Sequence, residues 1–166
     1  MIVVTGATGT IGRPLLGILV RESVPVRAVS RDLQAAGLPA GVENVAGDPS
    51  RPGTIAGYLD GVTTVFLHPR AVGEAAEELL ALAKERSVAR VVALSAINLD
   101  DDTTQQPSRF PGDRNKEAEE AAVAGGLDWT GSASGRPPSD DVEQVLGRPA
   151  RTYAEWVTDH TAAFQH

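Results

Sequence analysis

Three evenly spaced glycines are the first feature of this sequence that could carry chemistry. Gly6, Gly9 and Gly12 lie in the segment TGATGTIG, between an apolar, β-branched run and a segment with helical spacing of its apolar residues. A tight glycine turn lets main-chain N–H groups approach a pyrophosphate at the amino end of a helix. The spacing G-x-x-G-x-x-G, with a strand before it and a helix after it, therefore predicts a dinucleotide-binding turn. The alternative is a plain glycine turn.

Two arginines indicate which dinucleotide this turn would bind. Arg31 follows Ser30 at the end of the second expected strand, where a site for NAD(H) usually has an acidic residue for the ribose 2′-hydroxyl. A guanidinium forms paired hydrogen bonds to phosphate oxygens, and Arg13 could join Arg31 on a 2′-phosphate. These residues favour NADP(H) over NAD(H). Two alternatives stay open, because Arg31 could be a solvated surface arginine and Asp32 could reach a ribose hydroxyl.

Three further polar residues lie where expected strands end. Asp48 could meet the adenine edge of a dinucleotide, or cap the segment that follows it. His68 could act as an acid near a nicotinamide, or be a partly exposed loop histidine. Ser95 could hydrogen-bond a substrate carbonyl, or bond to main chain. His68 and Ser95 are thus the first candidate catalytic residues.

The elements that must position these residues alternate along the chain. Short apolar runs predict strands at residues 1–6, 24–30, 41–48, 62–69 and 89–97. Helical spacing predicts helices at residues 11–22, 52–61, 72–87 and 113–126. We interpret residues 127–130 as a sixth strand that is not completed, and residues 98–113 as a loop above the carboxyl ends of the strands. This alternation predicts an α/β protein with a parallel sheet covered on both faces.

Composition excludes several kinds of site. The chain has 166 residues, no cysteine and three widely spaced histidines, so we expect no disulfide, no thiol nucleophile and no metal site. A net charge of −7 argues against a nucleic-acid partner. No apolar run approaches the length of a membrane span, and we expect no signal peptide because Ile2 already belongs to the first strand. The expectation is a cytoplasmic protein.

A set of segments resembles the NmrA-like branch of the atypical short-chain dehydrogenase/reductase family. The segments are VTGATGTIGRPL, VRAVSRD, GVENVAGD, LDGVTTVFL, AKERSVARVVALSA and EAEEAAVAGGLDWT. The resemblance implies a Rossmann-like, doubly wound parallel sheet of five to six strands, with the cofactor between strands one and four. It also implies cofactor contacts by Gly6, Thr8, Gly9, Thr10, Ile11, Gly12, Arg31, Asp48, Leu67, His68, Pro69, Ser95 and Ala96.

The resemblance carries a departure at the catalytic position. Typical reductases of the wider family use a Tyr-x-x-x-Lys pair, in which the lysine lowers the tyrosine's pKa and the tyrosine donates a proton. Lys116 is the best match for the lysine, and it is either a ribose contact or a solvated helix lysine. Gly112 stands four residues before it, where the tyrosine is expected. The usual proton donor is therefore missing, as it often is in NmrA-like proteins.

The carboxyl-terminal part departs from the family as well. Residues 1–130 would form the NAD(P)-binding domain, residues 131–139 a linker, and residues 140–166 a short helical tail packing on the same domain. The family has a substrate-binding subdomain where this chain has the linker, so the chain looks like an internal deletion, natural or engineered. Loss of a subdomain would expose apolar surface, which a homodimer would bury.

Two functions from different classes follow. The first is an NADP(H)-binding oxidoreductase that transfers a hydride from NADPH to a small carbonyl, enone or quinone. The second is a non-catalytic NADP(H)-binding module, either a redox sensor or a truncated scaffold. The missing tyrosine and subdomain favour the second, whereas the glycine turn and Arg31 suit both. A weaker third candidate is a biosynthetic enzyme with non-redox chemistry.

Overall fold

The computed structural model describes residues 1–34, 36–96 and 114–134. The chain divides into two compact units, Met1–Ala133 and Ser134–His166, and nearly all of the described residues belong to the first. The expected loop at 98–113 and the expected tail at 140–166 lie outside the described residues. No helix within the described ranges is long and apolar enough to cross a membrane.

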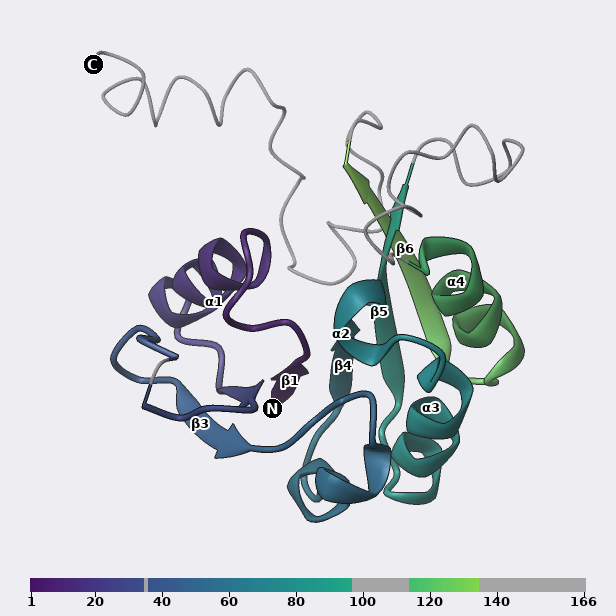
Figure 1. Ribbon diagram of the computed structural model, residues 1–166, viewed down its shortest axis with the longest axis horizontal. Helices are drawn as coiled ribbons and strands as arrows, with labels where there is room; N and C mark the ends of the chain where they lie inside the picture. Colours follow the sequence, from purple (N-terminus) through teal and green to yellow (C-terminus); the bar gives the residue numbers. More distant parts are fainter. Residues whose placement is uncertain (35, 97–113, 135–166) are drawn as a thin grey trace. The chain divides into compact units, whose positions relative to one another are not determined.

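Six strands form one sheet in the order β3-β2-β1-β4-β5-β6 (Figure 1). Parallel pairing joins β3 to β2, β2 to β1, β1 to β4 and β4 to β5. The strands are Ile2–Val4 (β1), Val26–Ser30 (β2), Glu43–Ala46 (β3), Thr64–Leu67 (β4), Arg90–Ala96 (β5) and Asp128–Ser134 (β6). The predicted doubly wound parallel sheet is confirmed, with six strands.

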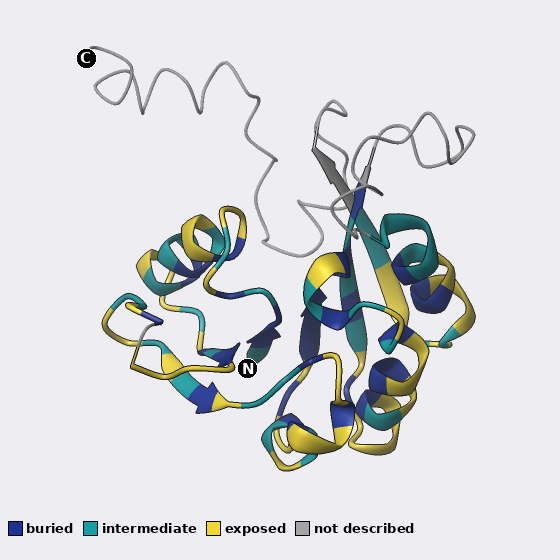
Figure 2. Cartoon of the chain, in the orientation of Figure 1, coloured by how far each residue is buried: buried dark blue, intermediate teal, exposed yellow. Residues whose placement is uncertain are grey.

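The central strands are apolar on both sides of the sheet. In β1, Val3 belongs to one buried cluster and Val4 to another. In β4, Val65 and Leu67 join the first cluster and Phe66 joins the second. Figure 2 shows these central strands as buried while the outer sides of the helices are exposed. Strands covered on both faces read as continuous apolar runs, which is why the sequence shows no alternation in them.

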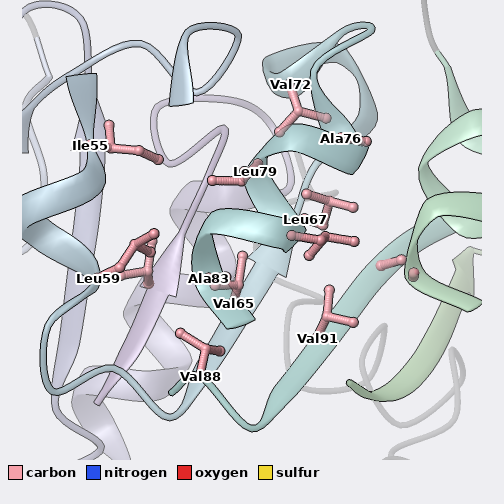
Figure 3. Close-up of a cluster of buried hydrophobic side chains, with 14 of the residues drawn as sticks. Ile55, Leu59, Val65, Leu67, Val72, Ala76, Leu79, Ala83, Val88 and Val91 are labelled. Atoms are coloured by element: carbon pink, nitrogen blue, oxygen red, sulfur yellow. The ribbon is translucent and has the colours of Figure 1, made fainter. Parts of the chain in front are cut away.

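Helices cover both faces of the sheet. The helix α1 (Gly12–Arg21) adds Leu16 and Leu19 to the cluster that contains Val4. The other face is covered by α2 (Pro69–Val72), α3 (Ala76–Glu85) and α4 (Asn115–Ala124). Figure 3 shows this larger cluster, in which side chains of α3 meet those of β4 and β5. Each fully buried aliphatic side chain stabilises the fold by about 1.5–3 kcal/mol, so these clusters hold the strand ends in place.

Glycines change two of the expected helices. The segment 52–61 forms two 3-10 helices, Pro52–Thr54 and Ala56–Leu59, in place of one α-helix. Gly53 and Gly57 lie within it, and glycine weakens an α-helix by about 1 kcal/mol relative to alanine. The segment 72–87 is interrupted at Gly73, which has a φ of +58° and ends α2 before α3 begins.

The sixth strand is longer than the sequence predicts. It continues to Ser134, through the first four residues of the segment expected to be a linker. This corrects the expectation that the strand stops after Thr130. Pairing beside β5 is available to any residue with a free N–H and C=O, so small residues extend the strand there despite a composition typical of linkers.

The strand order reverses direction between β1 and β4. These strands are neighbours, although β2 and β3 lie between them in the sequence. In open α/β sheets, ligands bind outside the carboxyl ends of the strands at such a reversal. The glycine turn follows β1, Arg31 follows β2 and His68 follows β4, so the parallel sheet brings all three to this edge.

Candidate functional site

The glycine turn has two positions that only glycine fits. Gly6 has a φ of +67°, which L-residues with a side chain rarely adopt. A Cβ on Gly12 would overlap the carbonyl oxygen of Gly6 and lie 2.8 Å from Cα of Ala7. Gly9 closes the turn by donating its N–H to the Gly6 carbonyl at 3.0 Å. The first turn of α1 is therefore packed directly on the end of β1, as a cradle for a pyrophosphate requires.

His68 lies against this turn. A Cβ on Gly6 would be 2.8 Å from Cγ of His68, so the imidazole ring covers the place that a side chain at position 6 would need. The histidine's position is fixed by Thr5, which sequence reasoning missed. The buried Thr5 hydroxyl accepts the N–H of His68 at 2.8 Å and donates to the carbonyl of Phe66 at 2.9 Å. The only sequence signal for Thr5 is its place directly before the glycine turn.

The other predicted residues of the turn differ in exposure. Thr8, Thr10 and Ile11 are exposed at the turn, where a ligand could reach them. The side chains of Leu67 and Pro69 are buried, so at the end of β4 these residues offer main chain to a ligand. Ala96 ends β5, and its side chain lies outside the described residues.

Arg13 is engaged with main chain on two sides. Its Nε donates to the carbonyl of Thr8 at 3.0 Å, and Nη1 donates to the carbonyl of Gly37 at 2.8 Å. Gly37 belongs to the connection between β2 and β3, so Arg13 links that connection to the glycine turn. The expectation that Arg13 joins Arg31 on a phosphate stays a prediction, and the structure gives its guanidinium these other partners.

Arg31 and Asp48 follow β2 and β3, two neighbouring parallel strands, so both lie at the same edge of the sheet. Arg31 is exposed directly after Ser30. Oδ1 of Asp48 accepts the hydroxyl of Ser50 at 2.7 Å and its N–H at 3.0 Å. The Ser50 hydroxyl lowers the pKa of Asp48 most; the Ser50 N–H and the charges of Arg31 and Arg51 lower it further, against an opposing effect of burial. The Asp48 carboxylate thus closes a local turn with Ser50 and stays ionised, whereas the N-cap of the 3-10 helix that follows is Arg51.

Asp32 is also occupied by its own turn. Its Oδ1 accepts the N–H of Gln34 at 2.9 Å, and its main-chain carbonyl accepts the Ser30 hydroxyl at 2.7 Å. Both contacts are local and shape the chain around Arg31. The carboxylate therefore has a structural role here besides any contact to a ribose hydroxyl.

Ser95 points to a partner that sequence reasoning missed. Its hydroxyl, on a residue only 7% exposed, donates to Oε2 of Glu119 in α4. A Cβ on Gly131 of β6 would lie 3.7 Å from the same carboxylate oxygen, so the carboxylate sits over β5 and β6. Lys116, one turn earlier in α4, is partly exposed. Nothing in the sequence singles out Glu119 from its glutamate neighbours.

No group of three potential metal ligands exists among the described residues. The cradle at Gly6 and Gly12, the exposed turn and the arginine after β2 fit a dinucleotide. A ligand of that kind would use main-chain N–H groups for its pyrophosphate and a guanidinium for a phosphate, and both kinds of donor are present.

Comparison with known proteins shows to which family the chain belongs. The sequence pattern of the NAD(P)H-binding family matches residues 6–145. The chain belongs to this family. An NAD(P)H azoreductase of Xenophilus azovorans is 33% identical over 135 residues, which make up 78% of this chain and 46% of the azoreductase. The chain thus spans less than half the length of this curated relative.

Two solved structures share the fold of this NAD(P)H-binding family member. An NADPH-dependent quinone oxidoreductase of Escherichia coli, complexed with NADPH, is 22% identical with a TM-score of 0.63, covering 79% of this chain and 47% of that one. A short-chain dehydrogenase/reductase from Veillonella parvula, in complex with NADP, is 17% identical with a TM-score of 0.64, covering 78% and 66%. The Rossmann-like fold is thereby confirmed.

Proposed function

We propose that this NAD(P)H-binding protein prefers NADP(H) and transfers a hydride from NADPH to a small carbonyl, enone or quinone. The observation that carries the binding part is the glycine cradle between β1 and α1, where Gly6 and Gly12 leave no room for a Cβ. The redox part is supported by the names of two similar proteins, an azoreductase and a quinone oxidoreductase. We assign the chain to the NmrA-like branch on its sequence motifs.

The chain's own residues have separate tasks in this proposal. The N–H groups of the glycine turn bind the pyrophosphate, and Arg31 binds the 2′-phosphate. NADPH, when bound, supplies the hydride. His68, held against the turn by Thr5, provides a proton or a hydrogen bond at the nicotinamide end. For turnover, Ser95 would have to turn its hydroxyl from Glu119 to the substrate oxygen, and Lys116 would contact the ribose.

A second function is favoured by one contact. Because Ser95 has a single hydroxyl proton and donates it to Glu119, it has no second proton for a substrate oxygen. Together with Gly112 in place of the usual tyrosine, this favours a non-catalytic NADP(H)-binding redox sensor. The two functions share the binding site and differ only in turnover.

A binding titration followed by a turnover assay tests both functions. NADPH and NADH are titrated separately into the protein while nicotinamide fluorescence is recorded, and NADPH should bind more tightly. NADPH oxidation is then measured with a panel of quinones, enones and azo compounds. Steady oxidation with one acceptor supports the reductase, and tight binding without oxidation supports the sensor. Failure to bind either dinucleotide would contradict the whole proposal.

The remaining expectations are also proposals. We infer that the protein is cytoplasmic, because the chain has no cysteine. We also infer that its partner is a small-molecule substrate and not a nucleic acid or a membrane. We infer a homodimer, since exposed large apolar residues such as Val123 and Trp129 lie on α4 and β6. Light scattering of the purified chain would measure the mass, and a monomer at all concentrations would contradict the dimer.

A further inference from the structure

Arg13 forms hydrogen bonds both to the glycine turn and to the connection after β2, which suggests a role for it other than contact with a dinucleotide. We propose that Arg13 is a positioning residue that ties the glycine turn to the β2–β3 connection, and that Arg31 reads the 2′-phosphate without it. The inference rests on the proposed preference for NADP(H). It assigns two arginines, which the sequence alone would place on one phosphate, to different tasks.

Main chain binds the guanidinium of Arg13 at one nitrogen of each of its two hydrogen-bonding edges. A paired contact to a phosphate needs two adjacent guanidinium nitrogens. The one Nε–H serves the carbonyl of Thr8, which removes the pair made by Nε and Nη2. The other pair of adjacent nitrogens is Nη1 and Nη2, and Gly37 lies next to it. The carbonyl of Gly37 accepts a hydrogen bond from Nη1, and a Cβ on Gly37 would be 3.6 Å from Nη1 and 4.0 Å from Nη2.

Both carbonyls bound by Arg13 belong to parts that the site needs in place. Thr8 is in the middle of the glycine turn, whose N–H groups would face the pyrophosphate. Gly37 has a φ of +52° and lies between Ala36, which is 1% exposed, and Leu38, which packs on the cluster beneath α1. The connection is therefore fixed to the core, and the hydrogen bonds of Arg13 fix the glycine turn to the connection.

Arg31 lies in a turn that is shaped by a different set of contacts. It directly follows β2, and the Ser30 hydroxyl and Asp32 carboxylate shape the turn around it by hydrogen bonds to main chain. The ionised carboxylate of Asp48 lies near it on the β3 side. None of these contacts involves Arg13. Removing Arg13 should thus loosen the pyrophosphate end and leave the reading of the 2′-phosphate intact.

Three variants separate the two tasks. In Arg13→Gln and Arg13→Lys, the affinities for NADPH and NADH should both fall by about three- to tenfold, because both dinucleotides have the pyrophosphate. Lysine keeps the charge but cannot bind two carbonyls in the fixed geometry of a guanidinium, so Arg13→Lys should not restore the affinity for either dinucleotide. Arg31→Gln should lower NADPH affinity by about tenfold and leave NADH affinity unchanged. The readout is the ratio of the two dissociation constants.

Two results would overturn the proposal. One is a fall in the NADPH-to-NADH preference in Arg13→Gln that Arg13→Lys restores, which would make Arg13 a phosphate reader. The other comes from amide hydrogen exchange without any ligand, where Arg13→Lys should speed exchange at residues 8–9 and 36–38 relative to wild type. Unchanged exchange there would show that Arg13 positions nothing. If wild type binds neither dinucleotide, the proposed function fails, and the exchange experiment still decides on the link.

Discussion

The shape of the glycine turn depends on contacts between single atoms. Gly6 needs its positive φ and leaves space for His68, whereas Gly12 lets α1 start against the carbonyl of Gly6. Thr5 then joins the ends of β1 and β4 through one hydroxyl. The turn is thus built by close approach of main chain, and its chemistry lies in N–H groups that side chains would otherwise cover.

Gly12→Ala tests this close packing at one atom. The added Cβ overlaps the Gly6 carbonyl, so we expect a loss of stability of about 1–3 kcal/mol and a loss of dinucleotide binding. Gly17→Ala in the same helix is the matched control, because nothing lies within 4 Å of its added Cβ. The control should gain about 0.5–1 kcal/mol and bind normally. Urea unfolding measures both variants, and equal effects would contradict the packing argument.

Asp48 makes part of the stability depend on pH. Its pKa in the folded chain is lowered from 3.8, chiefly by the Ser50 hydroxyl. The ionised Asp48 carboxylate, bound to Ser50, therefore stabilises the fold fully above the unfolded pKa, and this contribution is lost as the pH falls through the folded pKa. Asp48→Asn should be less stable than wild type at pH 7, and the difference should shrink below about pH 4. Thermal unfolding between pH 7 and pH 2.5 measures it.

Ser50→Ala is the partner variant for this test. It removes the largest cause of the lowered pKa while keeping the carboxylate. We expect Ser50→Ala to lose less stability at pH 7 than Asp48→Asn does. The difference in stability between Ser50→Ala and wild type should also shrink at low pH. A stability difference between wild type and Asp48→Asn that stays constant across this range would contradict a stabilising role of the ionised Asp48 carboxylate.

At the scale of elements, the sequence predicts most strands and little of their mutual contact. Continuous apolar runs predicted β1, β2, β4 and β5, because both faces of the sheet are covered. The break at Gly73 and the extension of β6 were not predictable from local pattern, since a glycine's φ and a strand's pairing depend on neighbours in space. The same holds for the pairs Arg13–Gly37 and Ser95–Glu119, each 24 residues apart.

The contact between Ser95 and Glu119 should hold α4 on β5. A hydrogen bond to a charged group contributes about 1.5–3 kcal/mol. We expect Ser95→Ala and Glu119→Gln to destabilise the chain singly, and the double variant to cost less than their sum by about 1 kcal/mol. Glu120→Gln, an exposed neighbour on the same helix, is the control and should change stability little. Strict additivity of the two variants in urea unfolding would rule out the coupling.

At the scale of the described unit, the site lies at the edge of a sheet that has one hydrophobic cluster on each face. The cluster beneath α1 includes Val4 and Ala28, and the cluster beneath α3 and α4 includes Val65 and Val91. The strands β1, β2 and β4 each contribute side chains to both clusters, and the candidate site lies at the carboxyl ends of these strands. A dinucleotide bound at these strand ends would contact elements of both clusters, which links binding to the stability of the whole unit.

NADPH should therefore stabilise this unit as one cooperative body. Since binding to the folded state alone adds RT ln(1 + [L]/Kd), each tenfold rise in NADPH well above its Kd should add about 1.4 kcal/mol to the free energy of unfolding. The urea dependence of that free energy should keep its slope, because the surface exposed on unfolding is unchanged. Urea unfolding at several NADPH concentrations, followed by circular dichroism, measures both quantities. A second transition that only NADPH shifts would mean that the ligand holds one cluster alone and that β1 and β4 do not couple the two.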